Sequence, residues 1–142
     1  MDIRICIDVP DIERAIAFYT QGLGLRAGRR LKSDWVELLG GPCPIDLLCE
    51  APGSAPLGEQ SPARRDFGRH WTPVHLDFVV DDADAGAARL VALGAKLERP
   101  VQQRRWGRMA NLADPFGHGI DLLQFQRRGY DEMLDPSPAG GG

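Results

Sequence analysis

An internal duplication constrains the fold of this chain more than any other feature of its sequence. The tetrapeptide Ile-Asp-Leu-Leu occurs at residues 45–48 and again at 120–123, which gives Asp46 and Asp121 equivalent positions. Aspartate is a poor strand former, yet both copies lie in runs that otherwise resemble buried strands. The repeat therefore predicts a duplicated unit that requires a carboxylate at this position in each copy.

The sequence before each tetrapeptide is duplicated as well. Residues 4–25 align with residues 75–97, and each copy passes from a strand through an aspartate into a helical pattern. Further strand patterns follow each helix, and the last of them contains the tetrapeptide. We therefore expect an α+β protein of two tandem βαβββ modules, with these residues equivalent: Arg4 with His75, and Asp11 with Asp82.

Apolar residues recur at helical spacing in residues 11–24 and 81–95, which predicts one amphipathic helix in each copy. Asp11 is well placed to be the N-cap of the first helix. Gly86, inside the second helix, either costs roughly 1 kcal/mol relative to alanine or permits close packing against the sheet.

Short apolar runs between turn signals predict the strands and the domain limits. The first module, residues 1–50, is joined by a Pro- and Gly-rich linker at 51–72 to the second module at 73–126. The extension 127–142 ends in a tail, 135–142, that we expect to be disordered. Strands are expected at these positions: 3–9, 25–31, 34–40, 44–50, 74–80, 96–103, 107–113 and 119–125.

Composition argues against several function classes. The net charge of −3 over 142 residues and the lack of a long basic run argue against nucleic-acid binding. The mixed cluster at 63–70 is interpreted as a solvated loop. No apolar stretch approaches the ~18 residues of a membrane-spanning helix, and the N-terminus does not resemble a signal peptide. Three cysteines without a Cys-x-x-Cys spacing indicate free thiols in a cytoplasmic protein.

Strand alternation indicates where the polar residues point. In each first strand and each tetrapeptide strand, the apolar face packs most economically under a helix. The opposite faces then carry Arg4, Asp46, His75 and Asp121 and form a cup between two curved sheets. Alternatively, these faces simply meet water, as in many antiparallel sheets. The cup is favoured because the same faces also carry the apolar side chains of Leu48, Val79, Leu123 and Phe125. A mixture of apolar and polar groups is typical of ligand pockets.

Three segments carry a resemblance to a known family: residues 9–25, residues 74–95, and the Asn-Leu-Ala-Asp-Pro-Phe-Gly-His-Gly-Ile-Asp-Leu-Leu stretch at 111–123. Over residues 3–126 the sequence resembles the vicinal oxygen chelate superfamily, the glyoxalase/bleomycin-resistance/dioxygenase group. The resemblance implies a glyoxalase-like fold, in which two βαβββ modules form a curved mixed sheet cup. It also implies a homodimer, whose modules either pack within one chain or are exchanged between chains.

In glyoxalase-like members four positions hold a divalent metal, and here they correspond to Arg4, Asp46, His75 and Asp121. The resemblance implies that Asp46, His75 and Asp121 are the ligands of one ion, which would be Zn, Ni, Mn or Fe. Arg4 departs from the pattern, because a guanidinium only donates hydrogen bonds and repels a cation. As an alternative to the metal, Arg4 pairs with Asp46 or Asp121, or it binds a substrate carboxylate.

The superfamily contains lyases, isomerases, dioxygenases and metal-free drug-binding proteins, so two functions follow from the resemblance. The first is a metal-dependent lyase or isomerase acting on a small organic molecule, with Asp46 or Asp121 as the catalytic base that moves a proton. The second is a metal-free binding or drug-sequestering protein, in which Arg4 holds an anionic group. Iron-dependent ring cleavage is less favoured, because such relatives use two histidines and only His75 remains here.

Four further residues are candidates for contacts with the ligand. Cys6 and Asp77 lie on the same predicted faces as Arg4 and His75 and would line the cup. Trp106 and Arg108 fall on a strand that borders the pocket in the family, although surface packing is equally compatible with their positions. The turn before the last strand contains Asp114, Gly117 and His118. We interpret these three residues as structural.

Overall fold

The computed structural model describes residues 1–134, and the predicted disordered tail lies outside these residues. The first module contains one helix and four strands, in the predicted order. Their bounds are β1 (Ile5–Val9), α1 (Ile12–Leu23), β2 (Arg26–Leu31), β3 (Trp35–Leu39) and β4 (Ile45–Cys49).

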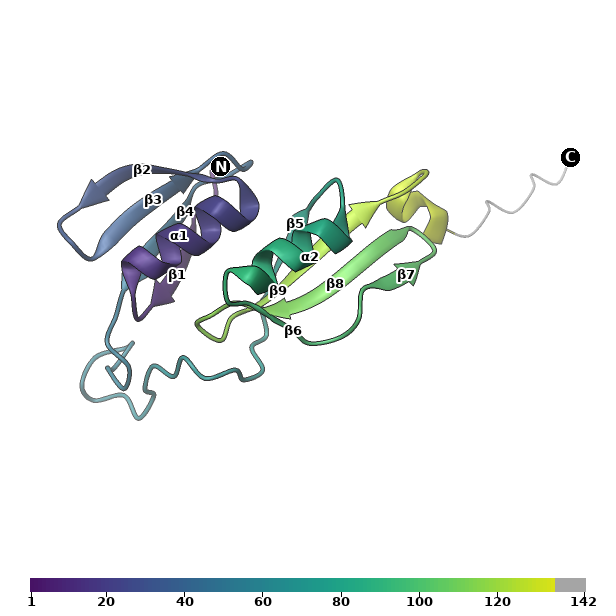
Figure 1. The fold of residues 1–142 in the computed structure, drawn as a ribbon. Helices are drawn as coiled ribbons and strands as arrows, with labels where there is room; N and C mark the ends of the chain where they lie inside the picture. Colours follow the sequence, from purple (N-terminus) through teal and green to yellow (C-terminus); the bar gives the residue numbers. More distant parts are fainter. Residues whose placement is uncertain (135–142) are drawn as a thin grey trace, which may run out of the picture.

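The second module repeats this order, with one strand divided in two (Figure 1). The strand expected at 96–103 is split into β6 and β7, both of which pair with β8. Pro100 lies between the two pieces and has no N–H group to donate to the ladder, which accounts for the break. The elements are β5 (Leu76–Val79), α2 (Ala83–Ala92), β6 (Lys96–Leu97), β7 (Gln102–Arg104), β8 (Gly107–Ala113), β9 (Gly119–Phe125) and a 3-10 helix, η1 (Gly129–Met133).

The two sheets have the same topology. Their strand orders are β1-β4-β3-β2 and β5-β9-β8-β6. In each sheet the first strand pairs in parallel with the strand that contains the tetrapeptide, so that Cys6 lies beside Asp46 and Asp77 beside Asp121. This symmetry confirms the α+β class and the two tandem βαβββ modules that the sequence predicts.

Each helix begins at the aspartate that the repeat aligned. The Asp11 carboxylate accepts a hydrogen bond from the backbone N–H of Arg14 at 3.0 Å, and Asp82 accepts one from Ala85 at 2.9 Å. These bonds satisfy backbone N–H groups that have no partner within the helix. The N-cap role of Asp11 is therefore confirmed, and its repeat partner has the same role.

Two glycines allow the helices to pack closely. A Cβ atom on Gly22 in α1 would lie 2.4 Å from Leu90 Cδ2 of α2, and one on Gly86 would lie 2.9 Å from Leu122 Cδ1 of β9. Of the two interpretations of Gly86, the structure supports close packing against the sheet. Both helices lie side by side on the same side of the molecule, and each covers its own sheet (Figure 1).

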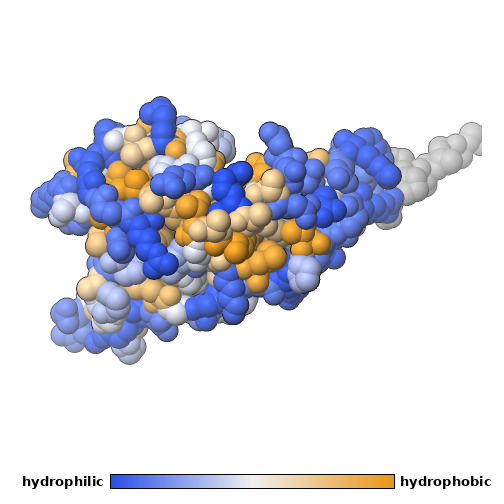
Figure 2. Space-filling view, viewed as in Figure 1, coloured by the Kyte–Doolittle hydropathy of each residue, from blue (hydrophilic) through white to orange (hydrophobic). Residues whose placement is uncertain are grey.

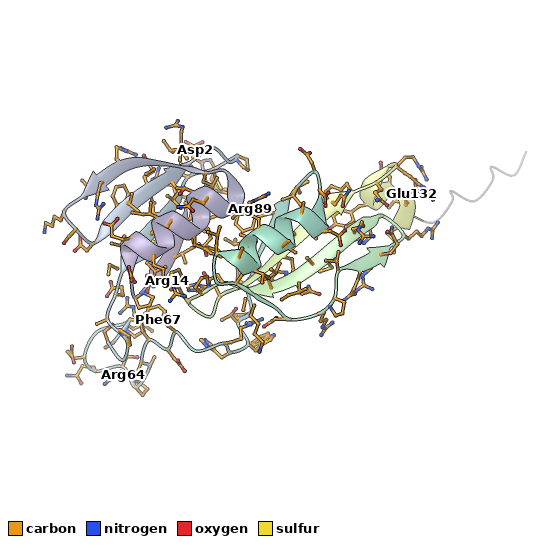
Figure 3. The ribbon with its side chains drawn as sticks, in the orientation of Figure 1. Asp2, Arg14, Arg64, Phe67, Arg89 and Glu132 are labelled. Atoms are coloured by element: carbon orange, nitrogen blue, oxygen red, sulfur yellow. The ribbon has the colours of Figure 1, made fainter. Side chains whose placement is uncertain are left out.

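The two modules share one hydrophobic core, which runs from Ile7 and Phe18 of the first module to Leu112 and Leu122 of the second. Polar contacts reinforce the boundary between the modules. Arg89 extends from α2 toward α1 (Figure 3) and donates from Nε to the carbonyl oxygen of Gly22 at 2.8 Å. The modules are therefore held together by both apolar packing and hydrogen bonds.

The surface is mixed in character. On the side that carries the helices, hydrophobic residues gather over the middle, where the modules meet, and hydrophilic residues cover both ends (Figure 2). In the part of the chain that the structure describes, neither helix combines the length and apolar character needed to cross a membrane.

Candidate functional site

The sheet face opposite the helix is called here the open face of each module. On the open face of the first module, Arg4 forms a two-pronged ion pair with Asp46. Its Nε donates to Asp46 Oδ2 at 2.9 Å, and its Nη2 donates to Asp46 Oδ1 at 2.7 Å. Asp46 is only 8% exposed, so both of its oxygens are held by this fork in a largely buried setting. Of the partners considered for Arg4, the structure selects Asp46.

A second carboxylate, Glu37, completes this cluster. Glu37 lies directly across from Asp46 in the β3–β4 pairing and is 3% exposed. Arg4 Nη2 donates to Glu37 Oε1 at 2.8 Å, and Arg29 donates to Glu37 from Nε at 3.1 Å and from Nη2 at 2.6 Å. Sequence reasoning missed Glu37, although it carries the signal that singled out Asp46, a charged residue inside an apolar strand.

The charges within this cluster compensate one another. Hydrogen bonds from Arg29 and Arg4 lower the pKa of Glu37 to about 2. Hydrogen bonds to Asp46 and then Glu37 raise the pKa of Arg4 above its ordinary value. Two cations thus balance two anions, and we call these four residues the ion-paired cluster.

The open face of the second module carries a different group, here called the carboxylate cluster: His75, Asp77 and Asp121. His75 Nε2 lies 3.1 Å from Asp77 Oδ1 and 3.6 Å from Asp121 Oδ2. Asp121 is 8% exposed and accepts a hydrogen bond from Asn111 Nδ2 at 2.8 Å. A neutral amide therefore occupies the position across from Asp121 that Glu37 occupies across from Asp46.

Burial raises the pKa of Asp121, and the nearby charge of Asp77 raises it further, while the Asn111 hydrogen bond acts in the opposite direction. No guanidinium is bonded to Asp121 among the residues that the structure describes. The second open face thus carries a buried carboxylate without a directly bonded guanidinium among the described residues, and Arg69 acts on it only at longer range. Such a group is suited to binding a positive charge or accepting a proton.

The residues of the carboxylate cluster also fit a divalent metal. One ligand atom from each of His75, Asp77 and Asp121 lies within 4.8 Å of the others, and no other such group occurs in residues 1–134. One imidazole and two carboxylates suit Zn, Mn, Fe or Ni. Two members of the predicted ligand set, His75 and Asp121, are together here with Asp77, whereas Asp46 is held by Arg4.

A pocket of about 210 Å³ adjoins the carboxylate cluster. Part of its wall comes from the linker, where Trp71 is largely exposed and Arg69 donates to Glu98 Oε1 at 2.6 Å. Arg65, in the same linker, donates to Asp8 at 2.7 Å. The 63–70 segment is a largely exposed loop, as the sequence indicated, and Arg65 and Arg69 anchor it to both modules.

The remaining predicted residues occupy different places. Cys6 lies on β1, and partial burial with nearby acidic charge raises the pKa of its thiol. Trp106 packs against Phe125 and Tyr130, with ring centroids 5.6 and 5.2 Å apart. Arg108 forms an ion pair of 2.7 Å with Asp84 of α2, on the face of the second sheet that the helix covers.

Two curated proteins, both described as anthracycline biosynthesis proteins, resemble the chain. It is 33% identical over 131 residues to the anthracycline biosynthesis protein DauV of Streptomyces sp. strain C5, covering 88% of this chain and 41% of DauV. It is 38% identical over 72 residues to DnrV of Streptomyces peucetius, covering 51% of this chain and 23% of DnrV. The chain therefore spans less than half the length of these relatives.

Solved structures share the fold. The fosfomycin resistance protein FosX of Listeria monocytogenes superposes with a TM-score of 0.68 at 19% identity, over 93% of this chain and 96% of FosX. TnmS3, an antibiotic binding protein from Streptomyces sp. CB03234, superposes with a TM-score of 0.58 at 26% identity, over 89% of this chain and 98% of TnmS3.

A family model described as the glyoxalase-like domain matches residues 4–123. This range contains nearly all of both modules, with the ion-paired cluster and the carboxylate cluster. The chain therefore belongs to the glyoxalase-like domain family.

Proposed function

We propose that this chain is a small-molecule-binding protein whose ligand lies on the open face of the second module, and that it binds this ligand without a four-ligand metal centre. The observation that carries the proposal is the ion-paired cluster. Arg4 holds both oxygens of Asp46, at the place where the family pattern would supply two metal ligands.

The Arg4 fork also limits what Arg4 itself does. Its Nε and Nη2 are already committed to Asp46 and Glu37, so an anionic ligand that used these atoms would have to displace a buried carboxylate. Arg4 is half-exposed, but Asp46 and Glu37 are buried, and taking the guanidinium from them would leave their charges uncompensated, which is unfavourable. In this proposal the ion-paired cluster, which has no net charge, does not hold the ligand. The polar contacts to the ligand come from His75, Asp77 and Asp121.

The comparisons support a ligand from the class of polycyclic antibiotics and their precursors. TnmS3 is described as an antibiotic binding protein, and DauV as an anthracycline biosynthesis protein. The exposed indole of Trp71 beside the carboxylate cluster offers a surface on which an aromatic ring system can stack. A protonated amine on such a ligand would be attracted to Asp77 and Asp121.

Calorimetric titration of the full chain with an anthracycline, in the presence of EDTA, tests the proposal. We expect saturable binding that EDTA leaves unchanged and that Asp121→Asn weakens about tenfold, the loss typical of one charged contact. Asp34→Asn, an exposed carboxylate in the β2–β3 turn, is the matched control and should bind like the wild type. Binding that disappears with EDTA would overturn the metal-free form of the proposal.

A metal-dependent enzyme is the second candidate, and the spacing of the carboxylate cluster favours it. FosX, which shares only the fold, has been crystallised with Mn(II). In this candidate a metal held by His75, Asp77 and Asp121 would polarise a substrate oxygen. Asp121, released from the metal, would accept and return a proton in a lyase or isomerase reaction.

Titration of the purified chain with Zn, Ni, Mn and Fe separates the two candidates. If the carboxylate cluster binds metal, Asp77→Asn weakens binding at least tenfold and Asp46→Asn has little effect. If the ligand set is the one implied by the family pattern, the two variants exchange roles. Failure of all four metals to bind at micromolar concentration would exclude this candidate.

A homodimer forms part of the proposal. The two open faces lie on modules placed side by side in the chain, so a second chain could set its first module against the second module of its partner (Figure 1). Size-exclusion chromatography with light scattering measures the molar mass of the protein and so distinguishes a monomer from a dimer. We also propose a cytoplasmic location, since Cys6, Cys43 and Cys49 are free thiols.

A further inference from the structure

A second cavity, of about 380 Å³, lies at the seam between the two modules. One wall comes from β1 and from Tyr19 of α1, and the other comes from residues 74–76 and 118–120. The apolar part of the lining is formed by Ile5, Ile7, Val74, Leu76 and Ile120. The proposed function does not use this seam cavity, and its volume suits a small ligand of one or two rings.

A buried hydrogen-bond network lies behind the cavity wall. Asp114 is 4% exposed and accepts four hydrogen bonds: from the backbone N–H groups of Phe116 and His118, from the Tyr19 hydroxyl at 2.7 Å, and from His118 Nδ1 at 2.8 Å. Burial raises the pKa of Tyr19 well above its ordinary value, so its hydroxyl keeps the hydrogen that it donates. The network joins α1 of the first module to a turn of the second.

This network fixes which nitrogen of the His118 ring carries a hydrogen toward Asp114. An ionised carboxylate only accepts hydrogen bonds, so the contact with Asp114 requires the hydrogen on Nδ1. A neutral imidazole with its hydrogen on Nδ1 presents a lone pair at Nε2. His118 lines the cavity and its side chain is 32% exposed, and Nε2 has no partner within the described residues. With the ring neutral, His118 Nε2 is therefore a hydrogen-bond acceptor in the wall that the second module contributes to the seam cavity.

The other polar groups of the wall are already engaged or unsuited to this role. Asp8 accepts from Arg65 at 2.7 Å, Thr72 donates to the carbonyl oxygen of Val74 at 2.8 Å, and His75 lies against Asp77. Partial burial raises the pKa of Cys6, which keeps it as a neutral thiol and not a nucleophilic thiolate. Asp8 is ion-paired with Arg65 on the wall of the first module, so His118 is the uncharged acceptor that the second module offers to a ligand.

We propose that the seam cavity binds a small aromatic alcohol, a phenol or a naphthol, whose hydroxyl donates a hydrogen bond to His118 Nε2. The aromatic body lies among the isoleucine side chains of the wall. A phenolic hydroxyl suits this acceptor because it is a stronger donor than an aliphatic alcohol.

Fluorescence titration of the full chain with 2-naphthol, and with naphthalene as the probe that lacks the hydroxyl, tests the proposal. His118→Phe keeps a ring in place but removes the acceptor. We expect it to weaken 2-naphthol binding about tenfold and to leave naphthalene binding unchanged. His70→Phe, an exposed histidine of the linker, should bind both probes like the wild type.

Val74→Trp provides a second variant, because Val74 is exposed at the rim and its replacement does not disturb the core. We expect this variant to bind both probes more weakly, because the tryptophan side chain obstructs the cavity. His118→Phe should leave anthracycline binding at the second open face unchanged, because His118 lines the seam cavity and not the pocket beside the carboxylate cluster. Equal binding of 2-naphthol to the wild type and His118→Phe, or no effect of Val74→Trp, would overturn the proposal.

Discussion

The open faces of the two modules are built from equivalent strands but carry opposite electrostatic arrangements. On the first face, Asp46 and Glu37 are neutralised by two arginines, and the charges balance within the cluster. On the second face, Asp121 is bonded to the neutral amide of Asn111 and lies close to Asp77. The comparison shows that equivalent strands carry a charge-balanced ion-pair cluster in one module and a carboxylate without a bonded guanidinium, within the described residues, in the other.

Removing Arg4 should produce the largest effect on stability within this comparison. Arg4→Met leaves the buried carboxylates of Asp46 and Glu37 with one cation instead of two, and we expect the melting temperature to fall by roughly 5 °C or more. Thermal unfolding followed by circular dichroism measures the change. The double variant with Asp46→Leu should recover part of the loss. A melting temperature equal to that of the wild type would show that the ion-paired cluster does not support the fold.

Converting the second face into a copy of the first sharpens the comparison. His75→Arg places a guanidinium at the position equivalent to Arg4, beside Asp121. We expect a modest rise in melting temperature and a loss of at least about tenfold in affinity for the ligand or metal of the second face. Calorimetry on the variant and the wild type measures both changes. Unchanged affinity would mean that the ligand does not use the carboxylate cluster.

Lowering the pH should destabilise the fold by protonating Glu37 on the first face. Its pKa in the folded chain is about 2, below its ordinary value of 4.5. The stabilisation from ionised Glu37 is therefore fully present above pH 4.5 and is lost as the pH falls toward 2. Urea unfolding of the wild type and Glu37→Gln between neutral and acid pH should show a stability difference that is constant above this window and shrinks within it. A difference independent of pH would contradict the assigned ion pairs.

The smallest expected change in stability comes from Asp121 on the second face. Its dependence on pH has the opposite sign to that of Glu37. Because burial raises the pKa of Asp121, its ionised form disfavours folding, and stability falls as the pH rises from the ordinary value toward the folded value. Asp121→Asn should therefore raise the melting temperature at neutral pH, by roughly 1–3 °C. Calorimetric melting at neutral pH measures the gain. A decrease instead would show that Asp121 already has a stabilising partner.

The duplication and the local patterns predicted most of the architecture. The repeat revealed two equivalent modules, and the Asp11 cap could be predicted because it depends only on residues a few positions away. Alternation placed Arg4, Asp46, His75 and Asp121 away from the helices, since side chains on a strand alternate between faces. The division between β6 and β7 was missed, although Pro100 was visible in the sequence.

The amino-acid sequence by itself determined which residues face which side of each sheet, because that depends on periodicity within one element. Only the tertiary structure decided which charges meet, because strand register and module packing bring together residues far apart in the chain. Register placed Glu37 beside Asp46 and Asp77 beside Asp121, and packing placed Tyr19 of one module on Asp114 of the other. The two open faces, equivalent in sequence position, therefore differ in chemistry.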